Sequence, residues 1–274
     1  MTWNTSTIPF RSAGTLLLGM LLLVSCNMER DTAQADTQYP VMARVTDVPD
    51  FAAIKDITAR KRAFFNFLRP IVRSENAKVA KARLRMLNIA ERVDNGDAVS
   101  PGDQQWLLKL ARKYHIPMAN LDDEQAWELL KRRVDTVPFR LALAQAANES
   151  SWGTSRFARQ GRNFFGEWCF TKGCGIVPSR RSPGMTHEVA VFASVNDSVA
   201  SYLYHLNRVD IYMPLRVARH KLHKWGRKAS AEALTSGLTG YSSRGNDYVD
   251  DIRKMIRINY DLMTGDQTGK TSPG

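Results

Sequence analysis

The residues best suited to chemistry lie together between positions 143 and 168. An alanine-rich, helix-forming segment ends on a single carboxylate, Glu149, and Trp152 follows three residues later. A carboxyl group between an apolar helix and an indole is expected to be partly buried, and burial favours its protonated form. A glutamic acid that keeps its proton near neutral pH can act as a general acid. A glutamate at a helix end is more often an ordinary surface residue, so the neighbouring motifs must decide between the two interpretations.

Residues 1–26 have the features of a bacterial export signal. Arg11 supplies a positive charge, and the apolar run from Leu16 to Val24 is shorter than the roughly 20 apolar residues of a membrane-spanning helix. The run ends in Ser25-Cys26, which resembles the lipobox of bacterial lipoproteins. We therefore expect cleavage before Cys26 and its lipidation; a signal without lipidation and an uncleaved anchor are the alternatives.

Two further cysteines, Cys169 and Cys174, enclose four residues. In the oxidising environment outside the cytoplasm this spacing favours a disulfide across a tight turn. The alternative is a zinc site, which needs two more ligands. His220 and His223 can share a helix face, but no cysteine or acidic residue lies beside them. We expect the disulfide, with no metal and no cofactor.

The chain is basic, with 274 residues and a formal net charge of +12. An exported basic protein meets anionic lipid surfaces and the carboxylate-rich cell wall rather than nucleic acid. Its positive charges fall in separate clusters, each typical of a solvated face rather than of a binding site. We therefore expect a wall polymer as partner and no nucleic acid.

The region before the motif is predicted to be a tether followed by helices. Residues 27–50 are polar and resemble a tether. Apolar residues then recur at helical spacing as far as Pro70, which predicts a kink or break, and again from Ser74 to Val93. Two helix starts follow, one with Ser100 as N-cap and one at Asp122. The prediction for 51–135 is a helical lead-in region of four segments.

The rest of the chain is predicted to be a helical domain, 136–263, with a small β-lobe. Glycine and proline punctuate 164–195, and residues 189–192 have strand character. Asn196 or Asp197 is expected to cap the return to helix, with further helices over about 213–225, 230–236 and 246–262. The polar tail 264–274 is expected to be disordered.

Two motifs identify a family. The run from Asn148 to Ser155, followed by Asn163-Phe164-Phe165-Gly166, resembles the glucosaminidase domain of glycoside hydrolase family 73. The stretch from Trp168 to Cys174 resembles the branch of that family called Bax proteins, which are periplasmic or lipoprotein relatives. The resemblance implies a mainly α, α+β fold: a lysozyme-like helical domain with a β-hairpin lobe, preceded by a helical N-terminal region.

The resemblance also implies an activity, which is cleavage of the β-1,4 bond between N-acetylglucosamine and N-acetylmuramic acid in peptidoglycan glycan strands. Glu149 matches the catalytic acid that protonates the leaving oxygen, and Trp152 is expected to pack beside it. Glu188 is the preferred second carboxylate and Glu167 the other candidate. The acetamido group of the sugar can replace a second carboxylate, because substrate assistance is a known exception to the two-carboxylate scheme.

Further site residues follow from the same resemblance. Tyr241 and Tyr248 match a late family motif and fit the catalytic role of orienting the acetamido group of the sugar; Tyr241 is expected to line the cleft, and Tyr248 either does so or packs its helix. The predicted substrate contacts are Trp152, Asn163, Phe165, Glu167 and Tyr248. A muramidase is an alternative on the same polymer, and a non-catalytic wall-binding lipoprotein is an alternative of another class. The expected location is the envelope of a Gram-negative-type bacterium, facing the periplasm, with Asn27 after Cys26 favouring the outer membrane.

Overall fold

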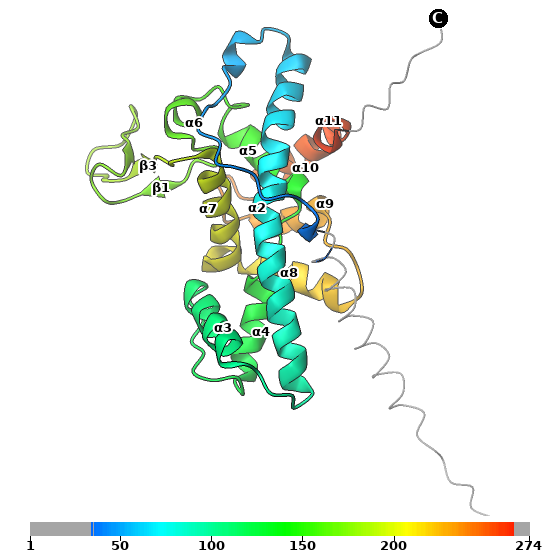
Figure 1. The fold of residues 1–274 in the computed structure, drawn as a ribbon. Coiled ribbons are helices and arrows are strands. Elements are labelled where there is room, and N and C mark those ends of the chain that lie inside the picture. Colours follow the sequence, from blue (N-terminus) through cyan, green and yellow to red (C-terminus); the bar gives the residue numbers. More distant parts are fainter. Residues whose placement is uncertain (1–33, 35, 266–274) are drawn as a thin grey trace, which may run out of the picture.

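A single long helix organises the molecule. The computed structural model describes residue 34 and residues 36–265, and helix α2, Ile57–Asp94, runs through this part with the other elements packed along it (Figure 1). The architecture confirms the predicted mainly helical α+β class, since the described residues form mostly helices and one small three-stranded sheet. The export signal, Cys26 and most of the predicted tail lie outside the described residues.

Helix α2 replaces the two helices predicted around Pro70. Proline inside a helix removes one hydrogen bond and costs about 3 kcal/mol, which is why the sequence predicted a break. Leu68, Ile71 and Val72 on either side of it are fully buried, and their packing outweighs that cost. The helix therefore continues unbroken from Asp56, which caps its start, to Asn95.

The first half of α2 belongs to the core of the predicted glucosaminidase domain. Phe64, Phe65 and Leu68 are buried in the same cluster as Leu141 and Ile252. The helices around this core are α5 (Phe139–Glu149), α7 (Val195–Arg208), α8 (Met213–Lys224), α9 (Ala231–Leu234), α10 (Asn246–Ile258) and α11 (Tyr260–Thr264), with the 3-10 turns η1 (Phe51–Ala53), η2 (Asp210–Tyr212) and η3 (Thr235–Leu238).

The second half of α2 forms another core with α3 (Pro101–Lys113) and α4 (Glu124–Arg133). Met86, Leu107, Trp127 and Leu130 are buried there. The predicted lead-in region is thus divided between two cores that share one helix, and α3 and α4 lie at the far end of α2 from the β-lobe (Figure 1).

Buried charges connect the two halves. Asp135, 2 % exposed, follows α4 and lies 3.1 Å from Arg219 Nε of α8 and 3.5 Å from Arg83 Nε of α2. His223 Nδ1 lies 3.4 Å from the same carboxylate. Burial raises the pKa of Asp135, but Arg83, Arg219 and His223 outweigh it, so the pKa is lowered and the carboxylate stays charged.

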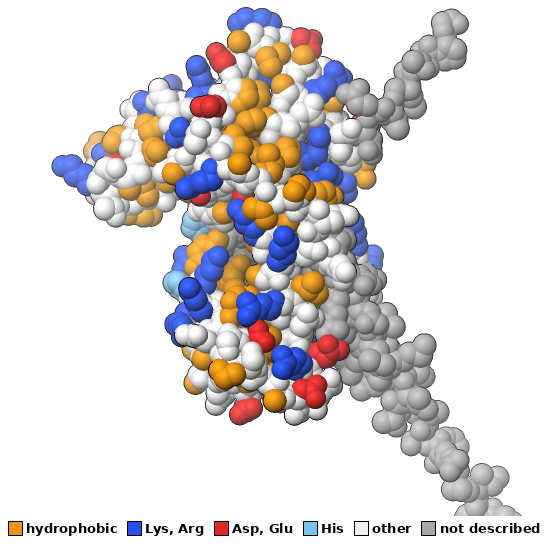
Figure 2. Space-filling model, in the orientation of Figure 1, with side chains coloured by type: hydrophobic (Ala, Val, Ile, Leu, Met, Phe, Trp, Pro, Cys, Tyr) orange, Lys and Arg blue, Asp and Glu red, His pale blue; other side chains and the backbone are white. Residues whose placement is uncertain are grey.

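The predicted β-lobe is present and small. Strands β1 (Trp168–Cys169), β2 (Gly175–Ile176) and β3 (Glu188–Ala190) form an antiparallel sheet in the order β1-β3-β2, next to the short helix α6 (Arg156–Gly161). Trp168 and Ile176 both pair with Val189. The disulfide expected between Cys169 and Cys174 closes the turn. The lobe projects from the molecule above a notch that separates it from the α3–α4 half (Figure 2).

Helix starts were predicted with mixed success. Ser100 caps α3 as expected, accepting a hydrogen bond from Asp103 N. Asp123, not Asp122, caps α4, and Ser194, not Asn196 or Asp197, caps α7. In both cases the side chain of the capping residue accepts a hydrogen bond from the backbone N–H three residues later, which is the geometry of an N-cap. The helix predicted over 246–262 divides at Asn259 into α10 and α11.

Much of the predicted tether is attached to the fold. Met42 N donates to Ser74 Oγ of α2, and Val45 N donates to Asn196 Oδ1 at the start of α7. Val195 N donates back to Val45 O, and Arg44 pairs with Asp197. In the described part of the chain we find no helix that is long and apolar enough to cross a membrane.

Candidate active site

Glu149 is the last residue of α5 and is partly buried, as the sequence predicted. A tight turn follows it, in which Ser151, Trp152 and Gly153 all have left-handed backbone angles, with φ of 50°, 60° and 75°. Non-glycine residues occupy this region at a cost of roughly 1–2 kcal/mol each. Ser150 stabilises the turn because its hydroxyl donates to Ala146 O and accepts from Gly153 N. Such local strain is typical of functional sites.

Aromatic residues of η1 and of the N-terminal half of α2 pack against this turn. A side chain at Gly153 would lie 2.5 Å from the Phe51 ring, so the position requires glycine for space as well as for φ. The Trp152 indole packs edge-on against Phe64 and Phe65, with ring centroids 5.8 and 5.4 Å away, and Lys61 lies over its face. Trp152 therefore fastens the Glu149 turn to α2, and a substrate contact of its own remains a prediction.

Four tyrosine hydroxyls lie in the electrostatic field of the Glu149 carboxylate. The Glu149 carboxylate raises the pKa of Tyr248, Tyr202, Tyr212 and Tyr241. Burial is the larger cause in every case, and together these effects keep the four phenols protonated at neutral pH.

These hydroxyls are part of an ordered network. Gln145, one turn before Glu149, donates to Tyr248 and accepts from Tyr202, at 2.9 and 2.7 Å. Tyr241 stacks on Tyr248 and donates to Phe165 O. Tyr248 is 2 % exposed, so it packs α10 against the core. The Glu149 carboxylate also acts on its hydroxyl, and a role for Tyr248 in the cleft stays a prediction.

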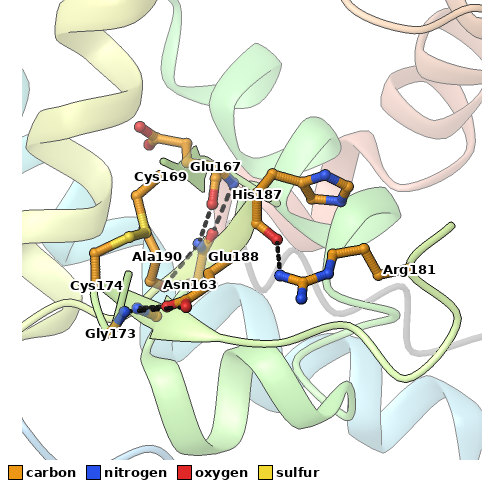
Figure 3. Close-up of a disulfide and its surroundings, with 10 residues drawn as sticks. Asn163, Glu167, Cys169, Gly173, Cys174, Arg181, His187, Glu188 and Ala190 are labelled. Carbon is orange, nitrogen blue, oxygen red and sulfur yellow. Dashed lines mark hydrogen bonds between the residues drawn. A yellow bond between two sulfur atoms is a disulfide. The ribbon is translucent and has the colours of Figure 1, made fainter. Parts of the chain in front are cut away.

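The turn predicted at 163–166 faces Glu149. Gly166 has φ of 69°, and a Cβ built there would lie 3.8 Å from Glu149 Oε2, so glycine keeps this approach to the carboxylate open. Asn163 locks the turn: its Oδ1 accepts from the backbone N–H of Phe165 and Glu167, and its Nδ2 donates to Glu167 O and Ala190 O (Figure 3). Asn163 and Phe165 are 1 % and 2 % exposed, which gives them positioning roles; their predicted substrate contacts stay untested.

Glu167 is bound by two residues of α7 that sequence reasoning did not single out. Its Oε2 accepts from Ser201 Oγ at 2.6 Å and lies 2.5 Å from His205 Nδ1. Ser201 and His205 are one helical turn apart, so they face the same side of α7. Nothing in the sequence pairs them with a residue 34 and 38 positions earlier, so the contact is visible only in the fold.

Glu188 has a different environment. Its two oxygens accept from the backbone N–H groups of Gly173 and Gly175, at 3.0 and 2.8 Å, and these bonds lower its pKa. Figure 3 shows the carboxylate turned toward Gly173 at the disulfide-closed turn. The side chain thus braces the β-lobe, while the catalytic role predicted for it remains untested.

Comparison with known proteins now adds to this geometry. Residues 124–261, half of the chain, match the family model described as mannosyl-glycoprotein endo-beta-N-acetylglucosaminidase. The chain belongs to the glucosaminidase family. It is also 29 % identical over 221 residues to Protein bax of Escherichia coli (strain K12), covering 81 % of this chain and 77 % of that protein. No solved structure gave a significant match.

The matched range begins at α4, yet the glucosaminidase-family core of this chain includes residues before it. Phe51, Phe64 and Phe65 belong to the cluster that supports the Glu149 turn. In the described residues, the side chains close enough together to hold a metal are Cys169, Cys174 and Glu188, and the two cysteines are joined as a disulfide. That set offers no thiolate ligand, so it does not fit a metal centre.

A separate cavity of about 520 Å³ lies at the opposite end of α5 from Glu149. Arg73, Phe139, Arg219 and Lys228 contribute to its lining, and so does Asp36 of the N-terminal segment. Burial raises the pKa of Asp36, although Thr136, Lys228 and Arg73 act to lower it. This cavity is therefore partly filled by the chain itself.

Proposed function

We propose that the protein is a peptidoglycan hydrolase, an endo-β-N-acetylglucosaminidase that cuts the β-1,4 bond between N-acetylglucosamine and N-acetylmuramic acid. The observation that carries the proposal is the setting of Glu149, a partly buried carboxyl group on a strained turn, open toward Gly166 and surrounded by neutral phenols. The family match supports a glycan substrate.

In this proposal Glu149 is the general acid. It gives its proton to the glycosidic oxygen as the bond to the anomeric carbon breaks and positive charge develops on the sugar. Tyr241 holds the turn opposite the carboxyl group through its hydrogen bond to Phe165 O, and the Glu149 carboxylate acts on the Tyr248 hydroxyl. The predicted second groups are Glu188 and Tyr241, and the substrate acetamido group is the alternative.

The proposed location is the cell envelope, with a lipid on Cys26 that anchors the protein to a membrane, the outer membrane being favoured by Asn27. The export signal in the sequence and the net charge of +12 support this location, since the cell wall is anionic. Labelling with palmitate should mark the protein, and the Cys26→Ser variant should lose the label while still being produced.

The decisive test is peptidoglycan digestion with the mature chain. New reducing ends should appear, and Glu149→Gln should reduce the rate by at least about 100-fold, the usual contribution of a general acid. Glu124→Gln, an exposed change at the start of α4, is the matched control. Mass spectrometry should find N-acetylglucosamine at the reducing ends. Muramic acid there would identify a muramidase, and binding without cleavage by the unmutated protein would identify a wall-binding lipoprotein.

A further inference from the structure

We infer that His205 is a catalytic residue, the general base that activates water, and that Glu167 and Ser201 position it. This inference rests on the proposed glycosidase function. It assigns the second half of the reaction to an imidazole rather than to a second carboxylate.

The first step of the argument is the orientation of the imidazole. Nδ1 of His205 lies 2.5 Å from Glu167 Oε2, without the alignment of a hydrogen bond, and a carboxylate against Nδ1 favours the proton on that nitrogen. With Nδ1 occupied, Nε2 is the ring nitrogen left to accept a proton. The His205 side chain is 38 % exposed while that of Glu167 is 11 % exposed, so water reaches the ring and the carboxylate lies behind it.

The second step is proximity to Glu149. A Cβ built on Gly166 would lie 3.8 Å from Glu149 Oε2, so this turn approaches the carboxylate, and Glu167 is the next residue, with its Cα about 3.8 Å further along the chain. The charges of Glu149 and Glu167 both act on the hydroxyls of Tyr202 and Tyr212. Glu149 and the Glu167–His205 pair therefore belong to one site, on two sides of the 163–166 turn.

The third step is the contrast with Glu188. Both oxygens of Glu188 are bound by backbone amides, which is the environment of a carboxylate that braces a fold. Glu167 instead directs one oxygen to a serine hydroxyl and an imidazole, and its Oε1 is buried without a hydrogen bond among the described residues. A carboxylate behind a solvent-facing histidine is the arrangement that orients a catalytic base and stabilises its protonated form.

The reaction then balances as follows. The water oxygen bonds to the anomeric carbon as the bond from that carbon to the leaving oxygen breaks. Glu149 gives its proton to the leaving oxygen, and His205 Nε2 takes a proton from the water. Glu149 ends as a carboxylate and His205 as an imidazolium beside Glu167, and proton exchange with solvent restores both. Direct attack by water inverts the anomeric configuration.

The experiment compares variants of the mature chain on soluble, uncrosslinked peptidoglycan strands. His205→Asn keeps an amide N–H near the Nδ1 position, so the link to Glu167 survives while the base is removed. We expect kcat to fall at least about 100-fold with little change in KM, and Glu167→Gln to lower kcat likewise. His115→Asn, the same change at an exposed histidine beside Arg208, should leave kcat unchanged.

The anomeric form of the first product provides a second measurement that needs no variant. Proton NMR early in digestion by the unmutated protein should show the inverted α-anomer. A retained β-anomer, or a His205→Asn protein whose kcat is within threefold of the unmutated protein, would overturn the assignment. Failure of the proposed function is distinguishable, because it would appear as undiminished activity of Glu149→Gln or as no cleavage by the unmutated chain.

Discussion

The buried carboxylate of Asp135 provides a quantitative test of how the two halves are joined. Asp135→Asn keeps the size of the side chain but removes the negative charge beside Arg83 and Arg219, each 1 % exposed. The amide can still accept from Thr136 N, which lies 2.8 Å from Oδ1. Its NH2 group must then face Arg219 Nε, where a donor meets a donor.

Removing one partner of a buried ion pair costs about 3–5 kcal/mol of the free energy of unfolding. For a folded part of this size each kcal/mol lowers Tm by roughly 2–4 °C, so we expect a fall of about 6–20 °C. Asp210→Asn is the matched control, because that side chain is 85 % exposed beside Arg133. Its exposed pair should contribute under about 1 kcal/mol. Urea unfolding and calorimetry at pH 7 measure both variants.

The pH dependence gives an independent check. The pKa of Asp135 is lowered in the folded protein, so its contribution is present above about pH 4, the ordinary aspartate pKa, and is lost as pH falls through the folded value. The difference in the free energy of unfolding between the unmutated protein and Asp135→Asn should therefore become smaller toward pH 3. An Asp135→Asn protein as stable at pH 7 as Asp210→Asn would refute the reasoning.

Three further predictions concern the turn after Glu149, a buried histidine and the β-lobe. Gly153→Ala should lower the free energy of unfolding by about 2–5 kcal/mol, because the left-handed backbone is strained and the new methyl group overlaps Phe51, and it should also lower kcat. Gly96→Ala is the control: it has a similar φ but open space around it, so urea unfolding should show a loss of only about 1–2 kcal/mol. Burial lowers the pKa of His220 to about 4. As pH falls from about 6.5 to 4, the unfolded chain therefore binds a proton that the folded protein does not, and the free energy of unfolding should fall. In urea unfolding at several pH values, the His220→Gln variant should show a weaker pH dependence. Cys169→Ser should cost at most about 2 kcal/mol because the disulfide closes a short loop, yet trypsin should cut the lobe near Lys172 faster; equal cleavage rates would show that the disulfide does not order the lobe.

Local signals in the sequence predicted the elements whose ends are fixed locally. Ser100 caps α3 because its side chain reaches a backbone N–H three residues later, and the alanine-rich segment before Glu149 predicted α5. The predicted break at Pro70 was wrong. The tendency of proline to end a helix is outweighed by the burial of the side chains before and after Pro70, and that burial depends on helices far away in the chain.

The candidate site divides in the same way. Glu149 and Gly166 are part of motifs and were found from their neighbours, although their approach to each other is a tertiary contact. His205 was missed because its significance arises from Glu167, which belongs to a different element. The buried position of Asp135 was likewise invisible, since nothing beside it in the sequence distinguishes it from a surface aspartate.

The attachment of the N-terminal segment sets a limit on where the protein can work. Asp36 lines the same cavity as Thr136, so if Cys26 carries the proposed lipid, about ten residues of chain separate that lipid from the folded body, a span of at most roughly 35 Å. A protein anchored in this way would diffuse laterally in the membrane, but it could not reach further from the membrane than this span. On the proposed function, a lipid-anchored enzyme would cleave only the glycan within that distance of the membrane, and the number of residues between Cys26 and Asp36 would set the distance.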